Sequence, residues 1–371
     1  MNEPRNWDVY PGRKKHYNWV TFALVIVVLV VAAVMLVSSS FQKYLIYRQD
    51  GVYLDLPFMD SGFEEIEDLE GVVREPVQAE IQFDGFDFSN VKTNAGEGIN
   101  ILKAMYVTYD QINDAALDEY VNRAKLNNAK ALVLQVKPEN GQLVYPSGTD
   151  FAVGYGLGGT YDLANKVILL KEKGMYLVAD VSCMLDSAIV SRYTGTALCT
   201  ANGQLLMTES GFWMDPYNTQ YREYLADLCK ELIYMGFDEI MLSYVSHPVA
   251  EGVIYSQTMS TPPTAESAVS SFAIYMEKEL GDLAPIGLRC SAEALSNGVG
   301  SNGQNMTVLG KVFDRLYCSS TSNTYDSDLA RALNFMEAST DTDRFVPYGY
   351  SAPTDNSWML LTWVDPEAGN N

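Results

Sequence analysis

The chain has 371 residues, which is enough for one large domain or two medium-sized ones. Its formal net charge is −22. Residues 1–48 hold six basic and two acidic side chains, so the rest of the chain carries −26. A surface this acidic repels phosphate backbones and anionic lipid headgroups, so we expect no nucleic-acid partner.

The cysteines do not form a recognisable metal or disulfide pattern. Five of them, Cys183, Cys199, Cys229, Cys290 and Cys318, are widely spaced, and no Cys-x-x-Cys pair occurs. We therefore expect buried thiols and neither a metal nor another cofactor. A bridge between Cys183 and Cys199 stays open if the domain lies outside the cell.

Residues 19–37 form an uncharged apolar run of nineteen residues. As a helix it would span roughly 28 Å, close to one hydrocarbon core, which predicts a transmembrane helix. Arg13, Lys14 and Lys15 precede it and favour a cytoplasmic N-terminus over residues 1–18, with the remainder outside. The alternative is a cleaved signal peptide. We favour the uncleaved anchor because the run is long and no Ala-x-Ala site follows.

Residues 38–97 have little periodic apolar pattern and contain an acidic cluster at residues 64–70. They are predicted to form a juxtamembrane stalk.

From residue 98 onward, strand-like and helix-like segments alternate, which is typical of parallel βα units. Strands are predicted at residues 99–108, 131–137, 175–182, 236–248, 285–291, 315–319, 344–350 and 358–364. Helices are predicted from about residue 114, at 161–173, before Gly236, at 265–280 and at 327–338. These steps predict an α/β fold, a (β/α)8 TIM-type barrel over residues 98–371. The segment 351–357 is too short for a normal helix.

The fourth predicted strand ends in Ser243, Tyr244, Ser246 and His247. The C-terminal ends of barrel strands line the active-site mouth, so chemistry is expected at these residues. None of them is a carboxylate. Ser243 and His247 are too far apart along a strand, about 13 Å, to form a nucleophile and base pair.

Several segments of the sequence resemble those of a known protein family. They include residues 103–108 and 131–137, the run Trp-Met-Asp-Pro-Tyr-Asn at 213–218 and the run Gly-Phe-Asp-Glu-Ile at 236–240. Over about residues 99–364 the chain resembles a bacterial family of glycosyl-hydrolase-like barrel domains. The resemblance implies a TIM-type barrel that acts on a glycoside or a cell-envelope polysaccharide. Members usually have acids where this chain has Gln135 and Ser243, whereas Asp186, Asp215 and Glu293 occupy matching acidic positions.

Glycoside hydrolysis ordinarily needs two carboxyl groups on either side of the scissile bond. Glu293 lies two residues past a predicted strand and is the first candidate for the proton donor, with Asp180 or Asp186 as its partner. Each could instead be a structural or exposed acid. Asp215 precedes Pro216 and is expected to be the N-cap of the helix that begins near Tyr217.

Aromatic rings can stack on sugar faces while polar groups bind the hydroxyls. The predicted substrate-binding residues lie at strand ends or in mouth loops: Tyr109, Tyr145, Trp213, Ser243, Tyr244, His247, Tyr348 and Trp363. Two hypotheses follow. One is a membrane-anchored, extracytoplasmic barrel that acts on or binds cell-envelope polysaccharide. The other is a catalytically inactive barrel that binds a glycan or a protein partner.

Overall fold

The computed structural model describes residues 45–48, 51–54, 100–256, 262–338 and 340–361. The chain divides into two compact units, Met1–Ile81 and Gln82–Asn371. In the first unit, β1 (Leu45–Arg48) and β2 (Gly51–Leu54) form an antiparallel hairpin, which falls within the predicted stalk. The predicted membrane helix at residues 19–37 lies outside the described residues. None of the helices in the described ranges combines the length and the apolar character needed to cross a membrane.

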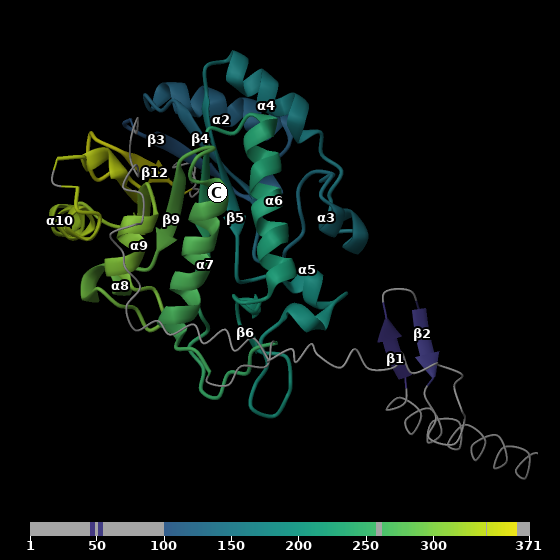
Figure 1. The fold of residues 1–371 in the computed structure, drawn as a ribbon. Helices are drawn as coiled ribbons and strands as arrows, with labels where there is room; N and C mark the ends of the chain where they lie inside the picture. Colours follow the sequence, from purple (N-terminus) through teal and green to yellow (C-terminus); the bar gives the residue numbers. More distant parts are fainter. Residues whose placement is uncertain (1–44, 49–50, 55–99, 257–261, 339, 362–371) are drawn as a thin grey trace, which may run out of the picture. The chain divides into compact units, whose positions relative to one another are not determined.

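The second unit contains a closed barrel of parallel strands in the order β10-β11-β12-β3-β4-β5-β8-β9, which confirms the predicted TIM-type barrel (Figure 1). The strands are β3 (Lys103–Val107), β4 (Ala131–Lys137), β5 (Tyr176–Ser182), β8 (Glu239–Ser243), β9 (Ile286–Cys290), β10 (Arg315–Ser319), β11 (Phe345–Gly349) and β12 (Trp358–Leu360).

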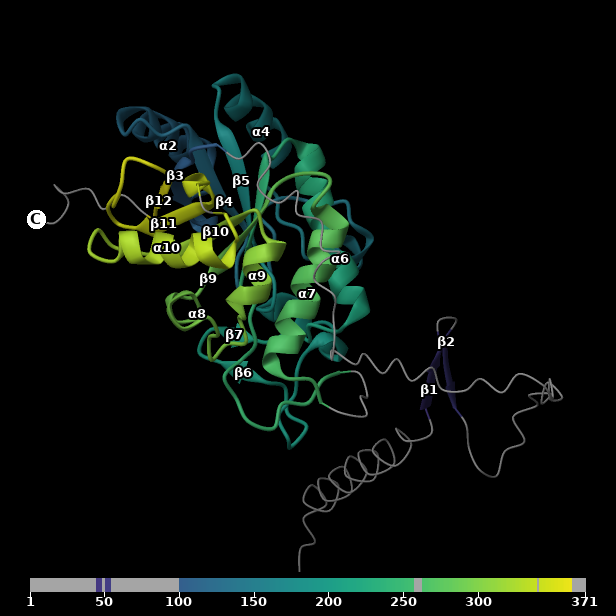
Figure 2. The ribbon, with the colours of Figure 1, turned by 60° about the vertical axis from the view of Figure 1, so that its left-hand side comes forward.

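Helices surround the barrel, as the turned view in Figure 2 also shows. They are α2 (Asp114–Leu126), α3 (Asp150–Tyr155), α4 (Leu163–Glu172), α5 (Ser187–Val190), α6 (Thr219–Met235), α7 (Ala265–Leu280), α8 (Ala292–Asn297), α9 (Met306–Val312) and α10 (Tyr325–Phe335). Short 3-10 helices lie at Tyr109–Gln111, Thr194–Thr196 and Thr342–Arg344, and the strands β6 (Met207–Thr208) and β7 (Gly211–Phe212) form a small hairpin.

The helices pack on the barrel through the apolar stripes that the sequence predicts. The buried residues of α2 are Leu117, Tyr120, Val121 and Ala124, which recur at helical spacing. Helix α6 ends at Gly236, whose φ of 116° is open to glycine and disfavoured for other residues.

Three details differ from the sequence-based expectations. The N-cap of α6 is Asn218, whose side chain accepts a hydrogen bond from the Tyr221 amide, and not Asp215. The short helices α3, α5, α8 and α9 were not predicted, because four to seven residues are too few to establish a helical period. All five cysteines are free thiols, so the Cys183 to Cys199 bridge does not form, whereas the expectation of mostly buried thiols is confirmed.

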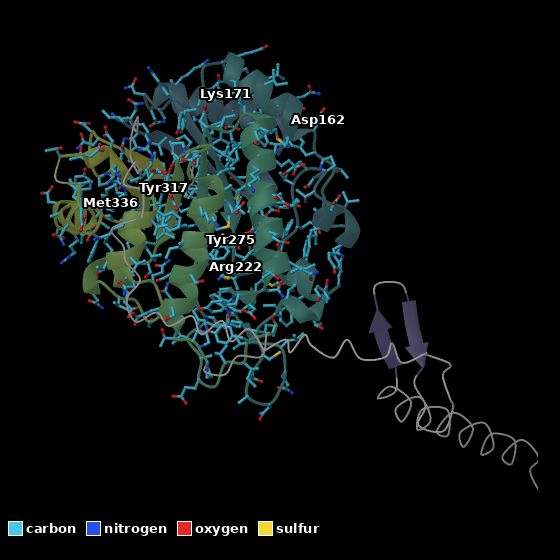
Figure 3. All side chains as sticks on the ribbon, in the orientation of Figure 1. Asp162, Lys171, Arg222, Tyr275, Tyr317 and Met336 are labelled. Carbon is cyan, nitrogen blue, oxygen red and sulfur yellow. The ribbon has the colours of Figure 1, made fainter. Side chains whose placement is uncertain are left out.

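A polar network closes the N-terminal end of the barrel. Glu239, at the start of β8, accepts hydrogen bonds from Arg315 Nε at 3.0 Å and from the hydroxyls of Tyr317 at 2.5 Å and Tyr176 at 3.0 Å. Tyr317, labelled in Figure 3, is fully buried among the side chains of the barrel interior. Glu239 and Arg315 are almost completely buried. Because the charges of Glu239 and Arg315 are paired with each other, we assign this network a structural role. An active site is expected at the opposite end of the barrel, where the strands have their C-terminal ends.

The outer wall of the barrel is less well covered beside β12 and β3. A hollow of about 600 Å³ lies there, lined by residues including Lys103, Met105 and Trp358. The short segment between β11 and β12 contains no helix, as its length predicted.

Candidate functional site

The candidate site lies at the C-terminal ends of the strands. Along each strand, residues that face the barrel interior alternate with residues that face the helices. The inward positions at this end are Tyr106 on β3, Gln135 on β4, Asp180 on β5, Ser243 on β8, Arg289 on β9 and Tyr348 on β11. Two of these side chains are an acid and a base of opposite charge type, Asp180 and Arg289.

Asp180 is fully buried and only partly satisfied. Its Oδ2 accepts a hydrogen bond of 2.6 Å from the Tyr106 hydroxyl. Its Oδ1 is buried without a hydrogen-bond partner among the described residues. A buried polar atom left unpaired costs about 1–3 kcal/mol. Atoms of this kind are rare, and an active site is one of the places where they are retained.

Burial raises the pKa of Asp180. The Arg289 charge is the largest opposing influence, followed by hydrogen bonding from Tyr106 and Ser243, although the Ser243 hydroxyl has no hydrogen bond of normal geometry with Oδ1. The net shift is upward, so the carboxyl holds its proton to a higher pH than an exposed aspartate. This is the direction that a general acid requires.

Tyr106 positions this carboxyl. Burial, and then the charge of Asp180, raise the pKa of Tyr106, so the phenol stays protonated and remains a hydrogen-bond donor. Together the two side chains form a fixed pair across neighbouring parts of the barrel interior.

Arg289 is half-buried beside the same pair. Its guanidinium carbon lies 4.8 Å from the ring centroid of Tyr348 and 5.8 Å from that of Tyr106. Burial acts to lower the pKa of Arg289, but Tyr348 and Asp180 outweigh it and the net shift is upward. The guanidinium is therefore permanently charged.

A second carboxylate, Glu139, lies in the loop after β4 and is half-buried. It lines a cavity of about 360 Å³ with Tyr109, Gln135 and Ser187 among its neighbours. Burial is the main cause that raises the pKa of Tyr244, and the negative charge of Glu139 is the second. Its charge also acts on Asp180, which places both carboxyl groups in one electrostatic environment.

Tyr244 has a φ of 52°, in the left-handed region that is unfavourable for a residue with a Cβ atom. Such a conformation costs on the order of 1–3 kcal/mol and is concentrated at functional sites. Gln135 accepts a hydrogen bond of 3.1 Å from the Tyr109 amide. It therefore shapes the mouth loop next to Glu139.

The predicted catalytic acid Asp186 lies behind the barrel wall. It forms a fully buried ion pair of 2.9 Å with Lys137 and accepts hydrogen bonds from the Ile189 amide and the Tyr221 hydroxyl. The N-cap bond to Ile189 starts α5. Both carboxylate oxygens are used internally, which favours a structural role.

The other predicted catalytic acid, Glu293, is exposed in the first turn of α8. The hydroxyl and amide of Ser301 both donate to its Oε2, at 2.6 and 3.1 Å, and lower its pKa. This shift is opposite to the one that a proton donor needs.

Only some of the predicted substrate-binding residues lie at the barrel mouth. Tyr244, Tyr348, Tyr109 and Ser243 lie at the mouth, where Ser243 is 3% exposed. Tyr145 is buried and donates to Glu231 on α6 at 2.7 Å. Trp213 is 8% exposed and its indole N–H donates to Thr208. Trp363 lies outside the described residues.

His247 belongs to a separate hollow of about 570 Å³. Its ring nitrogens contact the Pro248 carbonyl at 2.9 Å and the Tyr255 hydroxyl at 3.1 Å, and burial lowers its pKa. Both nitrogens are engaged, and neither contacts Ser243.

Sequence reasoning missed Tyr106, Glu139 and Arg289. The strand period contained the signal for two of them, because Tyr106 alternates with Met105 and Val107, and Arg289 with Leu288 and Cys290. Glu139 lies in a loop, where no period predicts direction. Among the described residues, no group of three or more His, Cys, Asp or Glu side chains could hold a metal ion.

Comparisons with known proteins give one family. The sequence model of the family described as "Putative glycosyl hydrolase domain" matches residues 104–332. No curated protein matches the chain.

Among solved structures, a hypothetical protein from Ruminiclostridium thermocellum is similar with 21% identity and a TM-score of 0.45, covering 50% of this chain and 96% of that one. A GH31 family sulfoquinovosidase from E. rectale has 16% identity and a TM-score of 0.43, covering 70% of this chain and 39% of that one. A cycloisomaltooligosaccharide glucanotransferase from Paenibacillus sp. has 12% identity and a TM-score of 0.47, covering 67% and 38%.

Proposed function

Since the chain belongs to the family of glycosyl hydrolase domains whose model covers residues 104–332, we propose that its barrel mouth binds a glycan and hydrolyses a glycosidic bond. The observation that carries the proposal is Asp180, a fully buried carboxyl with one unpaired oxygen and a raised pKa at the C-terminal end of β5. A group in this state can donate a proton to a leaving oxygen.

In the proposed reaction, Asp180 protonates the glycosidic oxygen as the bond to the anomeric carbon breaks. Glu139 takes a proton from the water that forms the new bond to that carbon. Tyr106 keeps the Asp180 carboxyl in place through its 2.6 Å hydrogen bond. Because Asp180 is 0% exposed, a sugar reaches it only after a side chain of the mouth moves.

A second candidate function is glycan binding without hydrolysis. It is favoured by Ser243 and Gln135, which supply no carboxyl at positions where the resemblance to the family implies one, and by the complete burial of Asp180. In that case the unpaired Oδ1 of Asp180 accepts a hydrogen bond from a sugar hydroxyl, and the tyrosines of the mouth provide stacking surfaces.

We further propose that residues 19–37 anchor the protein in the cell membrane with the barrel outside and residues 38–97 as the spacer. The uncharged run and the three basic residues before it support this orientation. The substrate would then be a cell-envelope polysaccharide. Protease treatment of intact cells tests the orientation: degradation of the barrel agrees with it, and protection contradicts it.

Hydrolysis is tested by incubating the full chain with cell-envelope polysaccharides and measuring new reducing ends. Asp180→Asn and Glu139→Gln should each abolish release, while Glu293→Gln should not. Release that survives in both mouth variants would contradict the assignment. Binding of a glycan without any release would support the second candidate.

A further inference from the structure

We propose that Arg289 makes the barrel mouth selective for a sugar residue that carries an anionic group, either a uronate carboxylate or a phosphate or sulfate ester. This inference rests on the proposed glycan-binding function and adds a substrate class to it. It is based on a comparison of the arginines within the same domain.

Among the described residues, two arginines, Arg315 and Arg289, face the barrel interior, and they differ in how their charges are compensated. At the N-terminal end, all three guanidinium nitrogens of Arg315 donate: Nε to Glu239, and the other two to the carbonyls of Asp343 and Asn100. The ion pair with Glu239 is 3.0 Å long. Each nitrogen of this guanidinium therefore has an acceptor, as expected for a buried charge.

Arg289 lacks such a partner. Within the described residues, Arg289 forms no ion pair with a nitrogen to oxygen distance of 4.0 Å or less. Its polar neighbour is the Tyr348 hydroxyl, and the Tyr348 and Tyr106 rings flank its guanidinium. A guanidinium has five N–H donors in a planar fork, so most of its donor capacity is available for a ligand.

The nearby carboxyl does not cancel this charge. Asp180 influences Arg289 electrostatically, but no ion pair of 4.0 Å or less joins the two among the described residues. Burial also favours the protonated, neutral form of Asp180. A half-buried cation without an ion-pair partner is an incompletely compensated charge, and an anionic ligand would compensate it.

The unpaired Oδ1 of Asp180 is a second, independent indication that a ligand binds here. A sugar with one anionic substituent could satisfy both groups at once. Its anion would pair with the guanidinium fork, since carboxylate and phosphate oxygens match that geometry, and a hydroxyl or glycosidic oxygen would meet Asp180.

The acidic character of the whole chain does not conflict with this selectivity. The charge of −26 beyond residue 48 repels a polyanion at long range, and salt screens this repulsion. A contact at a half-buried arginine is screened much less. The expected ligand therefore carries isolated anionic sugars among neutral ones.

The test is binding of the full chain, in mild detergent, to an array of bacterial polysaccharides that contain uronate, phosphate or sulfate groups. Each glycan is paired with a neutral counterpart, made by reducing the carboxyl group or by removing the ester. The wild-type protein should prefer the anionic member of a pair roughly 10- to 100-fold, as charge-assisted hydrogen bonds imply. Preference among the uronate, phosphate and sulfate pairs identifies the source of the charge.

Arg289→Met should abolish the preference, and Arg289→Lys, which keeps the charge without the fork, should restore part of it. Arg222→Met is the matched control. Arg222 also lies over two tyrosine rings, Tyr217 at 5.1 Å and Tyr275 at 5.6 Å, but it bonds Ser271 on α7 and lies outside the mouth (Figure 3). It should leave the preference unchanged.

Equal binding of both members of every pair, or a preference that survives in Arg289→Met, would overturn the inference and leave the glycan-binding function standing. Absence of binding to every glycan, anionic or neutral, would overturn the proposed function and the inference with it. Thermal melting of each variant shows whether a loss of preference comes from unfolding.

Discussion

Asp180→Asn is expected to stabilise the barrel at pH 7 while it abolishes hydrolysis. The wild-type carboxyl is fully buried, and burial raises its pKa. Asparagine keeps an oxygen that can accept the Tyr106 hydrogen bond, and its amide nitrogen replaces Oδ1, so the unpaired buried position remains and only the cost of ionising a buried carboxyl disappears. We therefore expect the free energy of unfolding at pH 7 to rise by about 1.4 kcal/mol for each pH unit by which the folded pKa of Asp180 exceeds the unfolded one.

The sign of the pH dependence follows from the raised pKa. The folded state holds the Asp180 proton more tightly than the unfolded state, whose pKa is about 3.9. The wild-type protein therefore loses stability as the pH rises from about 4 toward the folded pKa. The asparagine variant lacks this loss. Its advantage should be largest at neutral pH and should shrink toward pH 4.

Urea unfolding of both proteins at several pH values between 4 and 7.5 measures this difference, and reducing-end release measures activity. Asp215→Asn is the matched control, because Asp215 is equally buried but accepts three hydrogen bonds, from the Tyr217 amide and from the amide and hydroxyl of Ser256. It should lose about 1–3 kcal/mol. A loss of stability in Asp180→Asn at pH 7, or an advantage independent of pH, would refute the reasoning.

Three further predictions concern acids and their neighbours. Lys137→Met leaves the buried Asp186 carboxylate without its ion-pair partner, so the free energy of unfolding measured in urea should fall by about 3–5 kcal/mol. Lys230→Met is the control, because Lys230 is partly exposed and its ion pair with Glu279 should contribute at most about 1 kcal/mol. Gly141→Ala places a Cβ atom 1.8 Å from Asp186 Oδ1, at a residue whose φ is 81°. We expect the free energy of unfolding to fall by at least about 1–3 kcal/mol and the melting temperature to fall with it. An unchanged melting temperature would contradict this close contact. Glu293→Gln should leave the rate and its pH profile unchanged, and a shifted acidic limb would restore Glu293 as a candidate.

The barrel could be predicted from the sequence because its signals are local. Strands β4 and β10 and helix α7 have the bounds expected from apolar runs and helical spacing. Boundaries were less accurate where polar residues continue a strand. The predicted fourth strand covered residues 236–248, whereas β8 ends at Ser243, because Tyr244 turns into the left-handed region.

The candidate site was only partly predictable. The search for carboxylates just past strand ends gave Asp186 and Glu293, and the structure shows the first paired with Lys137 and the second bonded to Ser301 in solvent. Sequence position alone cannot distinguish an acid that faces the mouth from one that caps a helix. Asp180, inside a predicted strand, was among the candidates, but the sequence left open whether its side chain points into the mouth or pairs with a neighbour.

The sequence by itself determined the alternation of strands and helices, the family and the acidic character of the chain, because these depend on composition and on neighbours along the chain. Only the tertiary structure decided which side chains share the mouth. Closure of the barrel brings Tyr106, Asp180 and Arg289 together from strands far apart in the sequence. It also gives Arg315 the partners that Arg289 lacks, because the burial of a charge and its compensation depend on contacts between distant segments.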